Sequence, residues 1–325
     1  MKHVSILVPN GECSITNIEG TYQILLRVNA WLEEAGRPPL FTVQLVGLQR
    51  ETRMKNGLFA ISPDVMIKEV DRTDLILIPS VHGDKKKILV ENRPMLDWIV
   101  KQYRAGSAVA SLCIGAFLLA GTGLLDGKNC TTHWEFSDEF RELFPAVNLL
   151  EDKIITDENN IYTSGGAYSW LNLILYLVEK YAGREMAVTC SKGFQIDFQR
   201  DSQSPFIIFS GQKEHEDAPI RLAQEFIEKN IHSKITVDEL ASMLALGRRN
   251  LERRFKKATG NTIMEYIQRV KMEAVKKSLE TTRLGVNEAM DKVGYSDPKA
   301  FRVIFKKVTG LSPLQYRNRY NREFV

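Results

Sequence analysis

The chain has 325 residues and a formal net charge of +4. This length exceeds what a single hydrophobic core usually supports, so we expect two domains. No stretch approaches the roughly 18 apolar residues of a membrane span, and the apolar start at residues 4–8 is too short for a signal peptide. The composition therefore argues against a membrane partner and predicts a cytoplasmic protein.

The cysteines lie far apart in the sequence and lack the paired spacing of metal ligands. We therefore expect reduced thiols instead of a disulfide framework or a zinc site. No residue pattern predicts a metal or a cofactor. The four positions are Cys13, Cys113, Cys130 and Cys190.

Within the first 210 residues, short apolar runs alternate with helical patterns. Continuous apolar strands between helices are typical of a parallel sheet that is covered on both faces, so residues 1–210 are predicted to form an α/β sandwich. Besides the strand at 4–8, the expected strands cover 43–46, 75–78 and 108–112, and the expected helices cover 22–35, 94–103 and 168–181.

One segment of this domain has the pattern of a reactive site. Within residues 110–127 a buried strand runs directly into a Gly/Ala-rich helix, and Cys113 occupies the turn. This pattern predicts a nucleophile elbow, in which a sharp turn exposes the side chain and the helix N-terminus favours its thiolate. His133 is the candidate base, and the backbone N–H of Ile114 and the loop 81–83 are candidate oxyanion donors.

Residues 3–205 resemble the ThiJ/PfpI division of the class I glutamine-amidotransferase-like fold. The resemblance rests on the elbow, on the Thr-Thr-His-Trp motif at 131–134 and on the segments 163–167 and 200–206. It implies a flavodoxin-like parallel-sheet sandwich in which Cys113 and His133 occupy the family's cysteine and histidine positions. Enzymes of this group also place an acid just after the first strand, where this chain has Ser14 and Asn17.

Without a placed carboxylate, no residue is assigned a catalytic role, and Cys113 and His133 are vestigial candidates. Three interpretations are open: a working hydrolase or amidase, a ligand pocket on a retired active site, and a dimerisation module in which Cys113 only packs. We favour the ligand pocket. Its candidate residues are Asn17, His82, Gly83, Cys113, Ile114 and His133.

A repeat marks the C-terminal part, where the sequence of residues 255–266 recurs in similar form at 305–316. The polar, charged segment 211–219 before it is predicted to be a linker, which leaves 220–325 as the second domain. Each copy predicts a first helix, a short turn and a second helix, which is a helix-turn-helix used twice in an all-α domain. The helices cover 236–244 and 248–259 in one copy and 286–293 and 298–309 in the other, and a long helix at 263–279 joins them.

The second helix of each copy has one apolar face and one basic face. Residues 219–325 hold 22 Lys+Arg against 12 Asp+Glu, a net charge of +10, whereas residues 1–218 hold 22 against 28. This asymmetry predicts that the second domain binds a polyanion. The candidate DNA-binding residues are Arg248, Arg249, Glu252, Arg253, Lys257, Lys299, Arg302 and Lys306, of which Arg249, Glu252, Arg253, Lys299 and Arg302 are expected to reach bases.

Residues 220–320 resemble the DNA-binding domain of the AraC family of bacterial transcription regulators, through the segments 235–241, 251–257, 293–297, 301–307 and 309–317. A subgroup of that family carries a ThiJ/PfpI-like domain first, and the resemblance implies activation. We therefore expect a metabolite-responsive activator that binds double-stranded promoter DNA, contacts RNA polymerase and forms a homodimer. The alternative is a cysteine-dependent hydrolase or amidase of the ThiJ/PfpI type that carries a DNA-binding tail.

Overall fold

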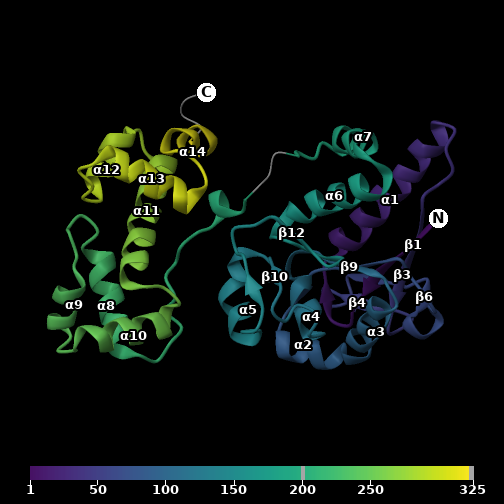
Figure 1. Ribbon diagram of the computed structural model, residues 1–325, viewed down its shortest axis with the longest axis horizontal. Helices are drawn as coiled ribbons and strands as arrows, with labels where there is room; N and C mark the ends of the chain where they lie inside the picture. The colour runs from purple at the N-terminus through teal and green to yellow at the C-terminus, as the bar shows by residue number, and fades with distance from the viewer. Residues whose placement is uncertain (199–201, 322–325) are drawn as a thin grey trace. The chain divides into compact units, whose positions relative to one another are not determined.

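The computed structural model describes residues 1–198 and 202–321, and contacts within the chain divide it into two compact units, Met1–Gln203 and Ser204–Val325 (Figure 1). Arg200 and Asp201, which belong to one segment of the ThiJ/PfpI resemblance, lie outside the described residues, as do residues 322–325 of the predicted second domain. Among the described residues, no helix has both the length and the apolar character needed to cross a membrane.

The first unit is built on a seven-stranded sheet with the order β12-β13-β9-β7-β1-β3-β6. All neighbouring strands are parallel except β12, which runs antiparallel to β13 at the edge. The strands are β1 (Lys2–Val8), β3 (Phe41–Gly47), β6 (Val65–Met66), β7 (Leu75–Ile78), β9 (Ala108–Ser111), β12 (Ile155–Glu158) and β13 (Ile161–Ser164). Three short ladders lie outside this sheet: β2 (Glu12–Cys13) with β8 (Val81–His82), β4 (Thr52–Met54) with β5 (Phe59–Ile61), and β10 (Asn129–Cys130) with β11 (Asn148–Leu149).

Helices cover both faces of this sheet, which confirms the predicted α/β sandwich. In Figure 1, α1, α6 and α7 lie on one face, and α2, α3 and α4 lie on the other. The helices are α1 (Ile15–Glu34), α2 (Lys85–Glu91), α3 (Arg93–Arg104), α4 (Ala116–Gly121), α5 (Ser137–Leu143), α6 (Trp170–Ala182) and α7 (Arg184–Phe194).

The antiparallel edge formed by β12 and β13 was not predicted. Asn159 and Asn160 join the two strands with φ values of 54° and 60°. Two consecutive left-handed residues form the tight hairpin turn that asparagine tolerates better than most residues. The Asn-Asn pair was therefore the signal in the sequence that could have revealed this hairpin.

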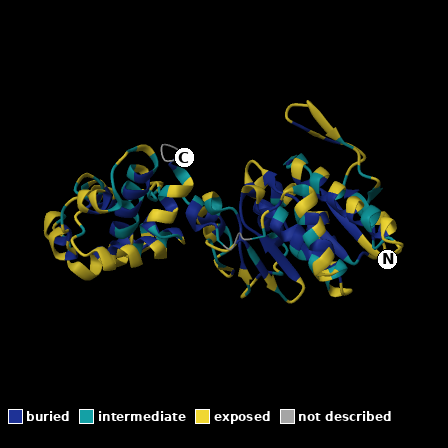
Figure 2. Cartoon of the chain, turned by 90° about the horizontal axis from the view of Figure 1, so that it is seen from above, coloured by how far each residue is buried: buried dark blue, intermediate teal, exposed yellow. Residues whose placement is uncertain are grey.

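The second unit is all helical, as predicted, and holds two small cores that share one helix. The long helix α11 contributes Ile263, Tyr266 and Ile267 to the first core and Met272, Val275 and Leu279 to the second. Buried residues lie on the sheet strands of the first unit and on the inner faces of the helices in both units, and exposed residues lie on the outer helix turns and loops (Figure 2). The helices are α8 (Ala218–Lys229), α9 (Val237–Met243), α10 (Arg248–Thr259), α11 (Ile263–Thr281), α12 (Val286–Lys292), α13 (Pro298–Thr309) and α14 (Pro313–Tyr320).

The division between the units lies earlier than the predicted boundary at residue 210. The backbone oxygen of Ile207 accepts a hydrogen bond from Lys276, and the Phe209 ring packs edge-on against Tyr266 at a centroid distance of 5.2 Å. Gln212, inside the predicted linker 211–219, accepts a hydrogen bond from the Gln224 side chain at 2.9 Å. These contacts use backbone oxygens and scattered rings, which leave no periodic signal in the sequence. Where an independently folding fragment begins stays a prediction.

Burial keeps the cysteine thiols protonated. Each of the four cysteines is free and buried. Burial raises the pKa of Cys13 and of Cys130 to about 12 and the pKa of Cys190 to about 11, from an ordinary value of 9.0. Because unfolded thiols ionise above pH 9.0 and these folded thiols do not, their contribution to stability is present below pH 9.0 and is lost as the pH rises towards 11 to 12.

We therefore expect that Cys130→Ala makes the first unit less sensitive to alkaline pH. When the pH rises from 8.5 to 10, one such thiol should lower the free energy of unfolding of the natural protein by about 1 kcal/mol. In the variant the free energy of unfolding should fall by about that much less. Urea unfolding of both proteins at the two pH values measures the difference. An equal fall in both proteins would contradict the prediction.

Candidate DNA interface and ligand site

Hydrogen bonds at the helix N-terminus fix where the first helix-turn-helix begins. The Thr236 hydroxyl accepts a hydrogen bond from the Glu239 N–H at 3.2 Å, and the Glu239 carboxylate accepts one from the Thr236 N–H, so a capping box begins α9. Ala245 then adopts a φ of 51°, which turns the chain out of the helix. Helix α10 begins at Arg248, as the sequence predicted.

The second helix-turn-helix differs in the N-cap of its recognition helix and in the steric limits on its turn. The Asp297 carboxylate accepts hydrogen bonds from the backbone N–H groups of Lys299 and Ala300 at 2.8 and 3.2 Å, which begins α13. Gly294, in the turn, has a φ of 71°, and a Cβ at this position would lie 2.2 Å from the backbone oxygen of His232. Only glycine therefore fits where the second turn meets the first half of the domain.

A buried lysine of α11 also contacts the place where the two helix-turn-helix copies meet. Lys271 is 6% exposed, and its Nζ donates hydrogen bonds to the backbone oxygens of Ser233 and Val293, both at 2.9 Å. Ser233 precedes α9, and Val293 ends α12, so one ammonium group bridges the two helix-turn-helix copies. Burial lowers the pKa of Lys271. We call Gly294, His232 and Lys271 with its two acceptors the junction.

The sequence repeat is also a structural repeat. Gly260 and Gly310 end the two recognition helices with φ values of 68° and 73°. After each glycine a tyrosine packs edge-on against the last phenylalanine of the recognition helix: Tyr266 against Phe255 at 5.3 Å and Tyr316 against Phe305 at 5.5 Å. Each recognition helix is thus held against its core in the same way.

The structure separates the basic residues into bound and free groups. Arg248 pairs with Asp238 at 3.0 Å and with Glu252 at 3.2 Å, and Arg254 forms a two-pronged pair with Asp217 at 2.6 and 2.9 Å. Arg254 is therefore not part of the free basic face, because its guanidinium binds the N-cap residue of α8. Within the described parts of the chain, five candidate side chains are exposed and make no hydrogen bond or ion pair: Arg249, Lys257, Lys299, Arg302 and Lys306.

Arg253 is the central basic residue of the exposed face of α10. Its guanidinium donates a hydrogen bond to the Asn250 side chain at 3.0 Å, which orients it along the helix without a neutralising charge. We expect Arg253→Ala to lower affinity for a preferred duplex by about 1–3 kcal/mol and to relax the preference for one base pair. Lys257→Ala should weaken binding to all duplexes alike, because a lysine near the helix end meets phosphate.

Competition between a preferred duplex and an unrelated duplex, at one salt concentration, separates these two effects. Both variants need the thermal unfolding midpoint of the natural protein, which their exposed positions allow. If both variants lost the same affinity for both duplexes, Arg253 would contribute only its positive charge and would not recognise a base.

The turn of the predicted elbow forms in the first unit, but it buries the Cys113 side chain, whereas the sequence predicted an exposed one. Cys113 follows β9 with a φ of 55°, an uncommon value for a residue with a side chain. Its backbone N–H donates to the Ser164 hydroxyl at 3.1 Å, and its carbonyl accepts from the Thr132 hydroxyl at 3.1 Å. A Cβ on Gly115 would lie 2.5 Å from the backbone oxygen of Ile78, so glycine lets the turn sit against the end of β7.

Burial opposes the thiolate expected at Cys113. The residue is 6% exposed, and burial raises the pKa of its thiol, although hydrogen bonds from the Ser80 side chain and the backbone N–H groups of Ala167 and Ile114 act in the opposite direction. The following helix α4 has only six residues, so its dipole is a weak counterweight. Burial therefore favours the neutral thiol of Cys113, and the backbone N–H groups of Ile114 and Ala167 lie beside it.

The hydrogen bonding of His133 does not suit a general base. Its Nδ1 accepts a hydrogen bond from the Glu135 N–H at 3.1 Å, which places the proton of the neutral ring on Nε2. Burial also lowers the pKa of His133. The ring packs over Gly166, where a Cβ would lie 2.3 Å from it. Across the described residues, no hydrogen bond joins His133 to Cys113.

The positions where related enzymes place an acid have structural roles. Ser14 caps α1, and the Asn17 side-chain oxygen accepts a hydrogen bond from the Ser80 N–H at 3.0 Å. The Ser80 hydroxyl donates to the backbone oxygen of Leu112 at 3.1 Å, next to the elbow. Asn17 and Cys113 therefore belong to one polar cluster that Ser80 connects. The nearby Glu12 carboxylate is engaged elsewhere, by the Lys55 N–H at 2.9 and 3.0 Å.

The loop of His82 and Gly83 brings a residue that the sequence analysis missed. Lys85 is 3% exposed, and its Nζ donates to the Gly83 oxygen at 2.9 Å and lies 5.0 Å from the ring centroid of Phe136. Burial lowers the pKa of Lys85. His82 is exposed on one side, and the partial desolvation of its ring together with the positive charges of Lys55 and Lys85 lowers its pKa. The signal for Lys85 was its place two residues after Gly83, at the start of α2.

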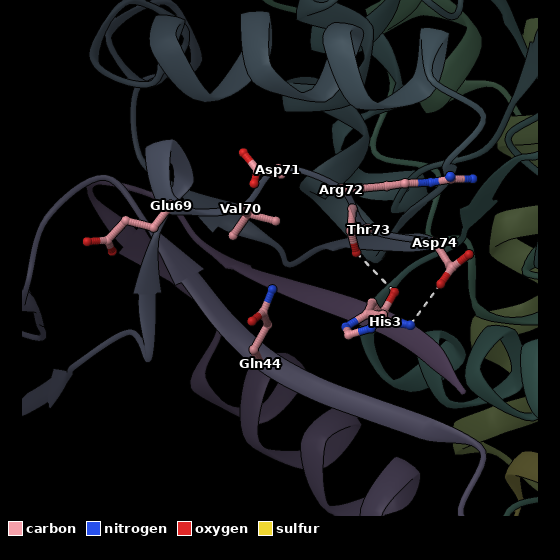
Figure 3. Close-up of a pocket in the computed structure, with 8 residues that line it drawn as sticks. All are labelled: His3, Gln44, Glu69, Val70, Asp71, Arg72, Thr73 and Asp74. Carbon is pink, nitrogen blue, oxygen red and sulfur yellow. Dashed lines mark hydrogen bonds between the residues drawn. The ribbon is translucent and has the colours of Figure 1, made fainter.

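A separate hollow of about 650 Å³ lies at the other end of the strands (Figure 3). It lies where β1 and β7 begin, whereas Cys113 follows the end of the parallel strand β9. None of the six predicted ligand residues lines it. The lining residues are His3, Gln44, Glu69, Val70, Asp71, Arg72, Thr73 and Asp74.

Both units match known families. Residues 28–180 match the DJ-1/PfpI family, and residues 240–319 match a helix-turn-helix domain. The HTH-type transcriptional regulator GbdR of Pseudomonas aeruginosa is 25% identical over 279 residues, which cover 82% of this chain and 72% of that protein. Isonitrile hydratase of Pseudomonas putida is 30% identical over 129 residues, covering 39% of this chain and 54% of that enzyme.

A solved structure supports the fold of the first unit. An AraC family transcriptional regulator from Pseudomonas putida superposes with a TM-score of 0.51 at 15% identity, covering 60% of this chain and all of that chain. At this identity the likeness concerns the fold alone.

Proposed function

The chain is a DNA-binding transcription regulator that joins a DJ-1/PfpI domain to an AraC-type helix-turn-helix domain, and from this premise we propose that the elbow around Cys113 is an effector pocket, not a catalytic centre. A small metabolite binds beside Cys113 and changes how the recognition helices engage a promoter. The site residues of this pocket are Asn17, His82, Gly83, Cys113, Ile114 and His133, to which Lys85 is added.

The burial of Cys113 and the hydrogen bond on His133 Nδ1 are the observations that carry this proposal. A cysteine hydrolase needs a thiolate and a base with a free lone pair. Here burial raises the pKa of Cys113, and the Nδ1 of His133 is occupied by the Glu135 N–H. The N–H groups of Ile114 and Ala167 converge on the sulfur, and the Ser80 hydroxyl, which donates to the backbone oxygen of Leu112, lies next to it; such polar groups are suited to hold a ligand. We therefore propose that the protein is not an enzyme.

Regulation then requires that the metabolite bind two states of the protein with different affinity. We propose that the protein works as a homodimer on double-stranded promoter DNA, activates transcription and contacts RNA polymerase when the effector is bound. The regulators among its relatives support the DNA-binding part of this scheme. The effector-dependent part rests on the polar cluster around Cys113.

We expect Cys113→Ser to reduce or abolish the response to the effector and to retain DNA binding without it. Serine keeps the size of the side chain but changes its hydrogen bonding, and the recognition helices belong to the other unit. A thermal-shift screen of metabolites on the full chain supplies the effector, because a ligand that binds only the folded state raises its apparent stability. Promoter-driven reporter activity with and without that compound is the readout.

The bulky Cys113→Trp variant and the buried-thiol control Cys190→Ser complete this test. Cys113→Trp should block the pocket, whereas Cys190→Ser, in α7, should respond as the natural protein does. A full effector response in folded Cys113→Ser and Cys113→Trp would contradict the pocket and leave pairing as the function of the first unit.

A cysteine hydrolase is the second candidate, because the chain is similar to isonitrile hydratase over part of its length. It requires turnover or a covalent adduct on Cys113, which intact-mass measurement with amides, α-oxoaldehydes or isonitriles would detect. An adduct in the natural protein that is absent in Cys113→Ser would favour this candidate over the effector pocket.

A further inference from the structure

An apolar side chain interrupts the basic face of the second recognition helix. Helix α13 buries Phe301, Phe305 and Thr309 against its core. On the opposite side Val303 is 64% exposed. Positions three or four residues apart share one helix face, so Val303 lies in the middle of a cationic stripe. The other members of this stripe, all exposed, are Lys299, Arg302, Lys306 and Lys307.

The internal repeat shows that this position differs between the two recognition helices. The shift of fifty residues that aligns Phe255 with Phe305 aligns Arg253 with Val303. In α10 that position carries a guanidinium held by Asn250 at 3.0 Å, whereas in α13 it carries a branched alkyl group. The two helices are fixed to their cores by the same ring and glycine contacts, so the two positions face outward alike.

A major groove offers few partners for an alkyl group. Each base pair presents hydrogen-bond donors and acceptors there, and the C5-methyl group of thymine is the apolar feature that distinguishes it. A single exposed valine is unremarkable on most surfaces. In the centre of a stripe that meets DNA, however, the valine side chain loses its hydration on binding. Its burial stabilises the complex only if it packs against another apolar group.

We propose that Val303 recognises the 5-methyl group of a thymine, so that the half-site bound by α13 requires a T·A pair. The corresponding position of the α10 half-site is recognised by Arg253, which hydrogen-bonds a base edge. The two half-sites are then different in sequence although the helices are repeats. This inference rests on DNA binding and is independent of the effector.

The test uses the full chain and duplexes selected from a random double-stranded DNA pool. In the strongest selected duplex, each thymine is replaced in turn by deoxyuridine, which removes only the methyl group. One replacement should weaken binding by the natural protein roughly three- to tenfold, as expected for one buried methyl. The same replacement should have a clearly smaller effect on Val303→Ala, about twofold or less, because the two γ-methyl groups that reach the thymine are missing.

Two control variants make the result specific. Arg253→Ala and Lys307→Ala should bind the selected duplex more weakly and keep the full deoxyuridine penalty. Val303→Thr, which retains one methyl, should keep part of it. All variants need the natural thermal unfolding midpoint, which an exposed position on α13 permits.

Equal deoxyuridine penalties for the natural protein and Val303→Ala at every thymine would overturn the proposal. So would selected duplexes that need no thymine, since the proposed contact has no other partner. A Val303→Ala variant that binds DNA normally but fails to activate a reporter would also overturn it, because the residue would then face a protein. Failure of the natural protein to select any sequence would instead contradict the regulator function itself.

Discussion

Gly294→Ala should destabilise the second unit by roughly 2–5 kcal/mol and remove most specific DNA binding. Two effects add at this residue. The φ of 71° costs a residue with a side chain about 1–2 kcal/mol, and the new Cβ would lie 2.2 Å from the backbone oxygen of His232. The backbone of His232 cannot move aside as a flexible side chain would, so the contact between Gly294 and His232 at the junction must open. Urea unfolding followed by helical circular dichroism measures the loss.

Gly260→Ala is the matched control for this change. Gly260 has nearly the same φ, 68°, but no atom lies within 4 Å of the Cβ position. The control should therefore show only the conformational cost of about 1–2 kcal/mol. If the two variants lost the same stability, the contact with His232 would contribute nothing, and the junction would not set the spacing of the recognition helices.

DNA affinity of the full chain should fall by about 10³- to 10⁵-fold between 50 and 200 mM salt, if six to ten phosphates are contacted. Bound phosphates release counterions, so each contact contributes about 0.9 to the slope of log affinity against log salt. The exposed lysines at the ends of the recognition helices are the expected phosphate contacts. The triple variant Lys257→Ala, Lys306→Ala, Lys307→Ala should therefore reduce the slope by about three.

A charge-matched control separates local contact from net charge. Lys86, Lys87 and Lys101 are exposed on the first unit, and their replacement by alanine removes the same three charges. That control should leave the slope almost unchanged. Fluorescence anisotropy with a labelled duplex over a salt series gives both slopes. Equal slopes for the two triple variants would mean that α10 and α13 do not lie on the phosphates.

The junction and the elbow show different limits of prediction from sequence. Gly294 was predicted as a turn residue, which local turn chemistry explains, but its contact with His232 joins residues that are 62 positions apart. The turn at Cys113 was likewise predicted from its strand, glycine and helix pattern. The state of its thiol was not, because it depends on Ser80, in the loop after β7, and on Ala167, in the short helical turn after β13.

The sequence by itself determined the two recognition helices of the second unit, Arg248–Thr259 and Pro298–Thr309, with their caps, and in the first unit the strands β1, β3, β7 and β9 and the helices α1, α3 and α6. These features depend on residues a few positions apart, through caps, glycines and hydrophobic period. Only the tertiary structure decided that Arg254 binds Asp217, that residues 204–219 belong to the second unit, and that burial favours the neutral thiol of Cys113. Burial and ion pairing depend on which distant segments meet, and composition and spacing do not encode that information locally.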